Sequence, residues 1–441
     1  MNARESALRV LNACRVNGAW ADAAIAAQLG REPLKSEDAS LCTRIVYGVL
    51  QNRLLLDYYV GAFCSQRIDH LQQPLPDILR IGAYQLLFLD KIPVSAAVNE
   101  SVELAKHNGR AAAAGLVNAV LRKLARQRAA LPPLPEEPVE RLVVETSHPR
   151  WLVERMRSLL GEDEAERFLR ANNEPAPLTV QVNPLKTTGE ALCEALAREG
   201  VTAKAHDWAP DCLTLSGTGE ITTLRPFLRG EFIVQDAAAR LVTLCAGVRP
   251  GMRILDVCAA PGGKTFSAAF AMGDEGEIVS CDLHENKLKR IRDGARRLGL
   301  TCINACAADG REARQEWEKS FDLVLCDVPC SGLGVIRKKP DIRYKDPAAL
   351  AALPEIQKAI LSNSSRYVKE NGLLVYSTCT VLPEENESVT DAFLSSHAGF
   401  AREGFESLPG IDGSTGQVTL WPQRHGTDGF YIARMRRITN D

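Results

Sequence analysis

Long apolar runs are missing from this 441-residue sequence. No stretch approaches the roughly 20 apolar residues that a membrane-spanning helix needs. The N-terminus MNARESALRV also lacks the apolar core of a signal peptide. These absences argue against an exported or membrane protein and predict a cytoplasmic protein that contacts no membrane.

Zinc-type cysteine pairs are missing as well. The chain has 13 cysteines, yet no Cys-x-x-Cys pair occurs, so the spacing typical of zinc sites is absent. An odd number of cysteines scattered over this length is also unlike a disulfide framework. We therefore expect free thiols, most of them buried apolar side chains, and no metal. A catalytic role has to be argued for each cysteine separately.

The common phosphate-binding motifs are missing too. Residues 260–265 read Ala-Pro-Gly-Gly-Lys-Thr, but a P-loop needs Gly-x-x-x-x-Gly-Lys-Thr, and Cys258 stands at the first glycine position. The dinucleotide pattern Gly-x-Gly-x-x-Gly does not occur either. A nucleotide triphosphatase or a dehydrogenase is therefore a poor interpretation.

The composition predicts several domains, with 45% hydrophobic and 24% charged residues. Residues 1–131 show helical spacing of apolar side chains and carry 16 basic against 11 acidic residues, which permits nucleic-acid binding. A proline-rich linker follows at 132–138. Residues 139–235 predict a small α+β module of ferredoxin-like or RNA-recognition-like type. Residues 236–441 predict the catalytic domain.

In that last region apolar strands alternate with amphipathic helices, which predicts a doubly wound parallel sheet. Helices are expected at 286–298 and 353–369, and an antiparallel pair within 405–435. The expected parallel strands are 253–258, 277–283, 302–309, 321–328 and 372–379. Ligands of such sheets bind beyond the carboxyl ends of the strands.

Three acids end the first three of these strands: Asp256, Asp282 and Asp309. Such a set suits a methionine amino group, a ribose and an adenine. The glycine turn between the first strand and its helix offers free backbone N–H groups and lets a ligand approach the backbone closely.

Two cysteines follow the ends of the next two strands. Cys330 lies in DVPCSG (327–332), and Cys379 lies in STCT (377–380). Neighbouring strands would bring both thiols to one substrate. A thiolate that adds to carbon 6 of cytosine makes carbon 5 nucleophilic enough to accept a methyl group. Asp327 could stabilise charge at ring nitrogen 3 during this addition.

At these residues the chain resembles the RNA 5-methylcytosine methyltransferases of the Sun/Fmu type, a family of class I enzymes that depend on S-adenosyl-L-methionine. The likeness covers residues 235–441 and rests on DVCAAPGGKT (256–265), DVPCSG, STCT and DGFYIARM (428–435). The resemblance implies that Cys379 is the nucleophile and that Cys330 assists breakdown of the covalent adduct. In the DNA cytosine methyltransferases a cysteine placed like Cys330 attacks the base, which leaves a second mechanism open. The implied cofactor-binding residues are Cys258, Ala259, Ala260, Pro261, Gly262, Gly263, Lys264, Asp282, Asp309 and Asp327.

Residues 1–131 are similar to the all-helical RNA-binding NusB family through 78–106 and GLVNAVLRKL (115–124). The two domains together have the layout of bacterial small-subunit rRNA cytosine methyltransferases. The resemblance therefore implies 16S ribosomal RNA as partner, and we expect a monomer. Two alternatives stay open: the same chemistry on tRNA, and a non-catalytic RNA-binding or antitermination protein. The basic run RKKPDIRYK (337–345) is expected to contact the RNA backbone, whereas Tyr344 is expected to pack against protein.

Overall fold

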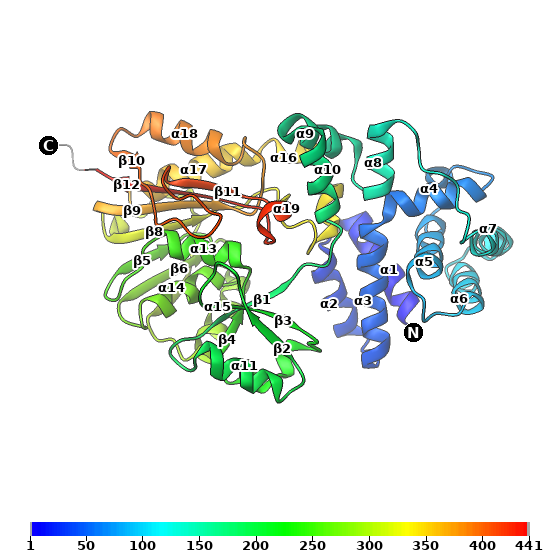
Figure 1. The fold of residues 1–441 in the computed structure, drawn as a ribbon, viewed down its shortest axis with the longest axis horizontal. Helices are drawn as coiled ribbons and strands as arrows, with labels where there is room; N and C mark the ends of the chain where they lie inside the picture. Colours follow the sequence, from blue (N-terminus) through cyan, green and yellow to red (C-terminus); the bar gives the residue numbers. More distant parts are fainter. Residues whose placement is uncertain (1, 439–441) are drawn as a thin grey trace. The chain divides into compact units, whose positions relative to one another are not determined.

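The computed structural model describes residues 2–438, which form two units (Figure 1). Unit 1 holds the described residues up to Glu174 together with the segment Ile336–Lys345. Unit 2 holds Pro175–Val335 and the described residues from Asp346 onward. The chain thus leaves unit 2 after Val335, contributes ten residues to unit 1, and returns.

Unit 1 is helical, as residues 1–131 predict. The apolar side chains at helical spacing form its core, and Leu79, Val98 and Leu121 are buried. Asn2 begins the first helix by accepting the backbone N–H groups of Arg4 and Glu5. The helices are Ala3–Asn17 (α1), Ala21–Arg31 (α2), Ser36–Gln51 (α3), Arg53–Phe63 (α4), Leu75–Phe88 (α5), Val94–His107 (α6), Ala114–Arg126 (α7), Pro138–Thr146 (α8), Arg150–Leu160 (α9) and Glu162–Ala171 (α10), with 3-10 turns at Ile68–His70 (η1), Ala111–Ala113 (η2) and Pro340–Tyr344 (η5).

The helices α8 to α10 pack within unit 1. Helix α8 contacts α4, and α9 packs against both α8 and α10. From the sequence, these helices were expected to belong to the small module at 139–235. The boundaries at 131, 138 and 235 stay predictions.

A small antiparallel sheet begins unit 2, with the strand order β2-β3-β1-β4. Its apolar side, which includes Val180, Leu213 and Phe232, packs with Leu192 and Leu196 of the following helix. This α+β arrangement confirms the predicted fold class of the middle region. The elements are Leu178–Val182 (β1), Gly189–Ala197 (α11), Thr202–Ala205 (β2), Cys212–Ser216 (β3), Ile221–Thr223 (η3), Arg225–Leu228 (α12) and Phe232–Val234 (β4).

The large sheet has eight strands in the order β10-β12-β9-β8-β5-β6-β7, and β11 pairs with β12. The strands β5 to β9 are parallel, whereas β10, β11 and β12 pair antiparallel. The predicted parallel sheet and the antiparallel pair within 405–435 are both confirmed. The strands are Arg253–Asp256 (β5), Glu277–Asp282 (β6), Ile303–Ala307 (β7), Phe321–Asp327 (β8), Val368–Thr378 (β9), Phe400–Arg402 (β10), Gln417–Leu420 (β11) and Phe430–Arg437 (β12).

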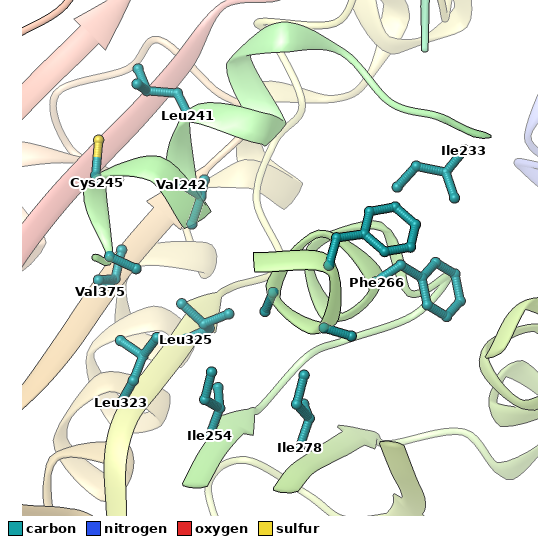
Figure 2. Packing of buried hydrophobic residues seen from close by; sticks show 14 of the residues in the cluster. Ile233, Leu241, Val242, Cys245, Ile254, Phe266, Ile278, Leu323, Leu325 and Val375 are labelled. Carbon is teal, nitrogen blue, oxygen red and sulfur yellow. The ribbon is translucent and has the colours of Figure 1, made fainter. Parts of the chain in front are cut away.

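Helices cover both faces of this sheet. Successive strand residues point to opposite sides, and apolar residues on both sides need helices to bury them. Ile254 and Leu325 pack with α13, α14 and α15, as Figure 2 shows for the first two helices. Leu255 and Val324 pack on the other face with α17 and α18. The elements are Ala237–Cys245 (α13), Gly263–Ala271 (α14), Glu285–Leu298 (α15), Gln315–Trp317 (η4), Pro347–Leu350 (α16), Leu353–Ser365 (α17), Glu387–Ser396 (α18) and Pro422–His425 (α19).

One element differs from its prediction. The helix expected at 353–369 ends at Ser365, and β9 already begins at Val368, which pairs with Phe321. Pairing with β8 extends the strand backward beyond the apolar run that starts at Leu373. Among residues 2–438, no helix combines the length and the apolar character that crossing a bilayer requires.

Candidate active site

The glycine turn after β5 is shaped by its backbone. Ala259 donates its N–H to Cys281 O at 2.7 Å, and Gly262 donates to Ala259 O at 2.7 Å. Gly262 has φ +111°, and a Cβ there would lie 2.6 Å from the Phe266 ring. Only glycine tolerates both conditions. The turn therefore delivers the N-terminus of α14 to the carboxyl edge of the sheet.

Asp256, at the end of β5, is fully buried beneath this turn. Thr265 Oγ1 donates to its Oδ2 at 2.7 Å, whereas Oδ1 has no hydrogen-bond partner in the described residues. Burial, partly offset by Thr265 and Lys264, raises the pKa of Asp256 to about 7. A buried acid with one free oxygen can receive a donor from a ligand.

Asp282 and Asp309 follow the neighbouring strands β6 and β7. Asp282 is buried, accepts the His284 N–H at 3.0 Å and lies 3.3 Å from Lys287 Nζ. Arg311 holds the Asp309 carboxylate through both oxygens, the shortest contact being 2.6 Å. This hydrogen bonding lowers the pKa of Asp309. Both predicted acids thus end strands at one edge of the sheet.

Lys264 and Asp327 form an ion pair close to this edge. Lys264 Nζ lies 2.5 Å from Asp327 Oδ2, and their side chains are 12% and 28% exposed. Ser377 donates to the other oxygen of Asp327 at 2.8 Å. Burial alone would lower the pKa of Lys264, but the charges of Asp327, and then of Asp256 and Cys379, outweigh it and raise that pKa.

Cys330 and Cys379 meet where β8 and β9 end. The two sulfurs lie 3.2 Å apart, because β8 and β9 are neighbours and Asp327 pairs with Ser377. The hydrogen bond to Cys379, followed by burial, raises the pKa of Cys330 well above its ordinary value. Either sulfur can be the donor in this contact.

A buried network fixes both cysteine loops. Glu385 is 2% exposed and accepts the Ser331 N–H at 2.8 Å and the Gln357 side-chain amide at 2.9 Å. Ser331 Oγ and Thr380 Oγ1 are 2.7 Å apart and join the two loops directly. The loop that carries Cys330 is therefore tied to the loop that carries Cys379.

The motif DGFYIARM (428–435) contributes a backbone contact to the loops that carry Cys330 and Cys379. Gly334 donates to Cys379 O at 3.0 Å, and Gly429 donates to Gly334 O at 2.8 Å. A Cβ at Gly334 would lie 1.9 Å from Gly429 O. This close approach explains why both positions are glycine.

The remaining predicted cofactor residues belong to the turn. Burial raises the pKa of Cys258 well above its ordinary value, so this thiol stays protonated and its backbone is the useful part. Ala260 and Gly263 are half-buried, and Pro261 is exposed. The structure thus brings the predicted cofactor residues to the carboxyl edge of the large sheet.

Three residues at this edge were missed by the sequence prediction: Gln235, Ser377 and Glu385. Gln235 is 6% exposed, and neither polar atom of its side chain has a partner in the described residues. Its Nε2 lies 3.3 Å from where a Cβ of Gly263 would be. The one signal in the sequence was the position of Gln235 between a strand and the helix cap Asp236.

S-adenosyl-L-methionine fits this set of residues. The free oxygen of Asp256 and the unpartnered amide of Gln235 offer acceptors and a donor. The turn ends at the N-terminus of α14, where backbone N–H groups without intrahelical partners can face a ligand. Methionine and nucleoside polar groups need such partners.

The basic run at 337–345 differs from its prediction at Arg343. That side chain is fully buried within unit 1 and donates to backbone carbonyls there, so the predicted contact with the RNA backbone is wrong for this residue. Tyr344 packs against protein as expected, with Arg53 over its ring.

Comparisons with known proteins find three family matches along the chain. The family described as 16S rRNA methyltransferase RsmB/F matches residues 245–436. The NusB family matches residues 1–126, and a ferredoxin-like domain of RsmF/B-like methyltransferases matches residues 148–222.

Full-length relatives are similar along almost the whole chain. The probable ribosomal RNA small subunit methyltransferase B of Bacillus subtilis is 38% identical over 98% of this chain and 98% of its own length. Ribosomal RNA small subunit methyltransferase B of Pseudomonas syringae is 33% identical over 99% and 97%. The crystal structure of PH0851 has a TM-score of 0.82 at 26% identity and covers 98% of this chain and 99% of that one.

Proposed function

This chain belongs to the 16S rRNA methyltransferase family RsmB/F, and from that premise we propose that Cys379 is the nucleophile with which it methylates carbon 5 of a cytosine in 16S ribosomal RNA. The observation that carries this proposal is the 3.2 Å separation of the Cys330 and Cys379 sulfurs beside Lys264. When bound, S-adenosyl-L-methionine would supply an electrophilic methyl group, whose bond to the sulfonium sulfur breaks as S-adenosyl-L-homocysteine leaves.

The thiolate of Cys379 forms a bond to carbon 6 of the cytosine, and carbon 5 becomes an enamine carbon that accepts the methyl group. The proton on carbon 5 then passes to water. The electron pair of that C–H bond restores the 5,6 double bond as the bond from carbon 6 to sulfur breaks. Cys379 leaves as a thiolate and is ready for another cycle.

The surroundings of the two sulfurs support these roles. Lys264 is the cation whose pKa responds to Cys379, whereas Glu385 and Asp327 face Cys330 with negative charge. A positive charge favours a thiolate and a negative charge disfavours it. Cys330 therefore stays a thiol, and its S–H group can stabilise the departing thiolate of Cys379.

The Lys264–Asp327 pair supplies the acid. Addition of the thiolate to carbon 6 places negative charge on ring nitrogen 3, which a proton donor neutralises. Lys264 Nζ donates to Asp327 Oδ2 at 2.5 Å, so this pair can pass a proton to that nitrogen and take it back when Cys379 leaves. Ser377 keeps the carboxyl oriented.

Cofactor binding is assigned to the turn 258–264 and to the acids at the strand ends. Asp282 and Asp309 suit the ribose and the adenine, and Asp327 is assigned to the same cofactor site. Asp256 and Gln235 join this set because their buried polar atoms lack protein partners.

RNA binding is assigned to the NusB-like residues 1–131, which are followed by the linker 132–138, the module 139–235 and the catalytic residues 236–441. Basic side chains such as Arg122 and Arg126 are exposed on α7 and can contact phosphates. We place the enzyme in the cytoplasm, in keeping with its 13 free cysteines. We also expect it to be a monomer.

Tritiated methyl transfer to unmethylated 16S rRNA tests the function. We expect label on carbon 5 of cytosine in 16S rRNA and none in tRNA. Label in tRNA would move the same chemistry to another substrate. Tight RNA binding without any transfer would favour the non-catalytic alternative.

A further inference from the structure

The segment Ile336–Lys345 continues the loop that carries Cys330, yet it packs in unit 1. Its apolar side chains Ile336 and Ile342 are buried, and η5 contacts helix α3. We call these ten residues the anchor segment.

Arg343 is the centre of the anchor segment and is fully buried. Its Nη1 lies 3.0 Å from Gln51 O, 3.2 Å from Thr146 O, 3.1 Å from Ser147 O and 3.0 Å from Asn173 Oδ1. Gln51 and Thr146 are the last residues of α3 and α8. The negative ends of two helix dipoles therefore meet at one guanidinium group.

The four acceptors that contact Arg343 Nη1 in the described residues are uncharged oxygens. Burial lowers the pKa of Arg343 to about 10, which still leaves the side chain charged at neutral pH. Helix carbonyls that lack intrahelical partners need a donor, and Arg343 supplies it for two helices. Removing this donor would take the Arg343 contact from Gln51 O, whereas Thr146 O would keep Asn173 Nδ2 at 2.7 Å and Ser147 O would keep the Tyr344 hydroxyl at 3.4 Å. The anchor segment would then be held less firmly in unit 1.

Two further contacts hold the segment on the same unit. Tyr344 donates its hydroxyl to Leu50 O at 2.9 Å. Asp341 Oδ2 accepts the Ala21 N–H, at the start of α2, at 3.3 Å. The anchor segment is thus fixed at the ends of three helices of unit 1, namely α2, α3 and α8.

The other end of the connection is fixed in unit 2. Gly334 is bonded to Cys379 O and to Gly429, and Cys330 lies four residues earlier in the chain. Six residues, 335–340, join Gly334 to the anchored Asp341. A connection of six residues limits how far apart its two fixed ends can move, so the position of the anchor segment restrains the loop that carries Cys330.

We infer, on the basis of the role proposed above for Cys330, that Arg343 and Tyr344 are positioning residues. By holding the anchor segment in unit 1, they keep the Cys330 loop in the conformation in which the covalent adduct breaks down and methylated RNA is released. Unit 1 then affects turnover through the anchor segment that it holds. Loss of these contacts slows breakdown of the covalent adduct and leaves formation of that adduct intact.

The variant Arg343→Met tests this inference in the full-length enzyme with unmethylated 16S rRNA. We expect kcat to fall at least tenfold, KM for RNA and for S-adenosyl-L-methionine to stay within about twofold, and a denaturation-resistant protein–RNA adduct to accumulate. Arg343→Lys should retain most of the turnover, because a single nitrogen makes all four contacts and an ammonium group offers three donors.

The matched control is Leu124→Ala, which removes a fully buried side chain from α7 in the same unit. This variant should lower the melting temperature without accumulating adduct. Tyr344→Phe, which removes only the hydroxyl, serves if Arg343→Met does not fold, and it should accumulate adduct to a smaller extent.

The inference is overturned if Arg343→Met shows wild-type turnover without adduct. Tyr344→Phe is judged in the same way if Arg343→Met does not fold. Equal turnover and adduct levels in Arg343→Met and Leu124→Ala would also overturn it. Cys330→Ser, assayed in parallel, distinguishes failure of the role proposed for the anchor segment from failure of the role proposed for Cys330. If Cys330→Ser accumulates adduct and the anchor variants do not, the inference fails alone. If Cys330→Ser itself accumulates none, the proposed role of Cys330 fails.

Discussion

The variant Asp256→Asn should make the stability of this protein less dependent on pH. Burial raises the pKa of Asp256 from 3.8 to about 7, so the native state binds a proton that the unfolded chain releases above about pH 4. The stability from this proton is fully present below pH 4, falls between about pH 4 and pH 7, and is gone above pH 7. Three pH units at about 1.4 kcal/mol each give a loss of roughly 4 kcal/mol.

Asparagine has nearly the same shape and cannot ionise. It can still bond with Thr265, which also lies 3.0 Å from Ser280 Oγ. Without cofactor, the variant and the wild type should therefore be similar in stability near pH 4. At pH 8 the variant should be more stable by up to about 4 kcal/mol.

Urea unfolding of both proteins at pH 4, 6 and 8 measures this difference. Comparing variant with wild type at each pH cancels the other titrating groups. A difference in unfolding free energy that stays constant from pH 4 to pH 8 would refute the claim that Asp256 is buried with a raised pKa.

Three further substitutions probe the site. Ser377→Ala removes the donor to Asp327. Because a hydrogen bond to a charged group contributes about 1.5–3 kcal/mol, single-turnover methyl transfer should slow by about tenfold or more. An unchanged rate would contradict the orienting role of Ser377. Gln235→Leu should weaken cofactor binding about tenfold in calorimetry, since it removes two unpartnered polar atoms, while RNA affinity stays constant; equal cofactor affinity would exclude Gln235 from the site. Glu385→Ala leaves the Ser331 N–H without its acceptor, so adduct trapped on RNA should increase, and unaltered adduct levels would show that this loop needs no such support.

The sequence was informative where function depends on strand ends. Cys330 and Cys379 were expected to lie side by side because each follows a strand of a doubly wound sheet, and β8 and β9 are neighbours. The order of parallel strands follows from general rules of chain connection. Motif spacing therefore predicted much of the geometry of this edge.

The anchor segment could not be predicted in the same way. Its basic residues lie beside the Cys330 loop in the sequence, which suggested contact with RNA. In the structure Arg343 serves two helix ends contributed by residues almost 200 and almost 300 positions away. Long-range burial of this kind leaves no periodic pattern. Gln235 was missed although it stands between a strand and a helix cap, because a single glutamine there belongs to no motif.

The covalent bond between enzyme and RNA tests the central claim most directly. Cys379→Ser and Cys330→Ser should be incubated with unmethylated 16S rRNA and S-adenosyl-L-methionine, and protein–RNA species that survive denaturation should be quantified. We predict no adduct with Cys379→Ser and abundant, slowly resolving adduct with Cys330→Ser. Normal adduct formation by Cys379→Ser together with none by Cys330→Ser would contradict the assignment and make Cys330 the nucleophile.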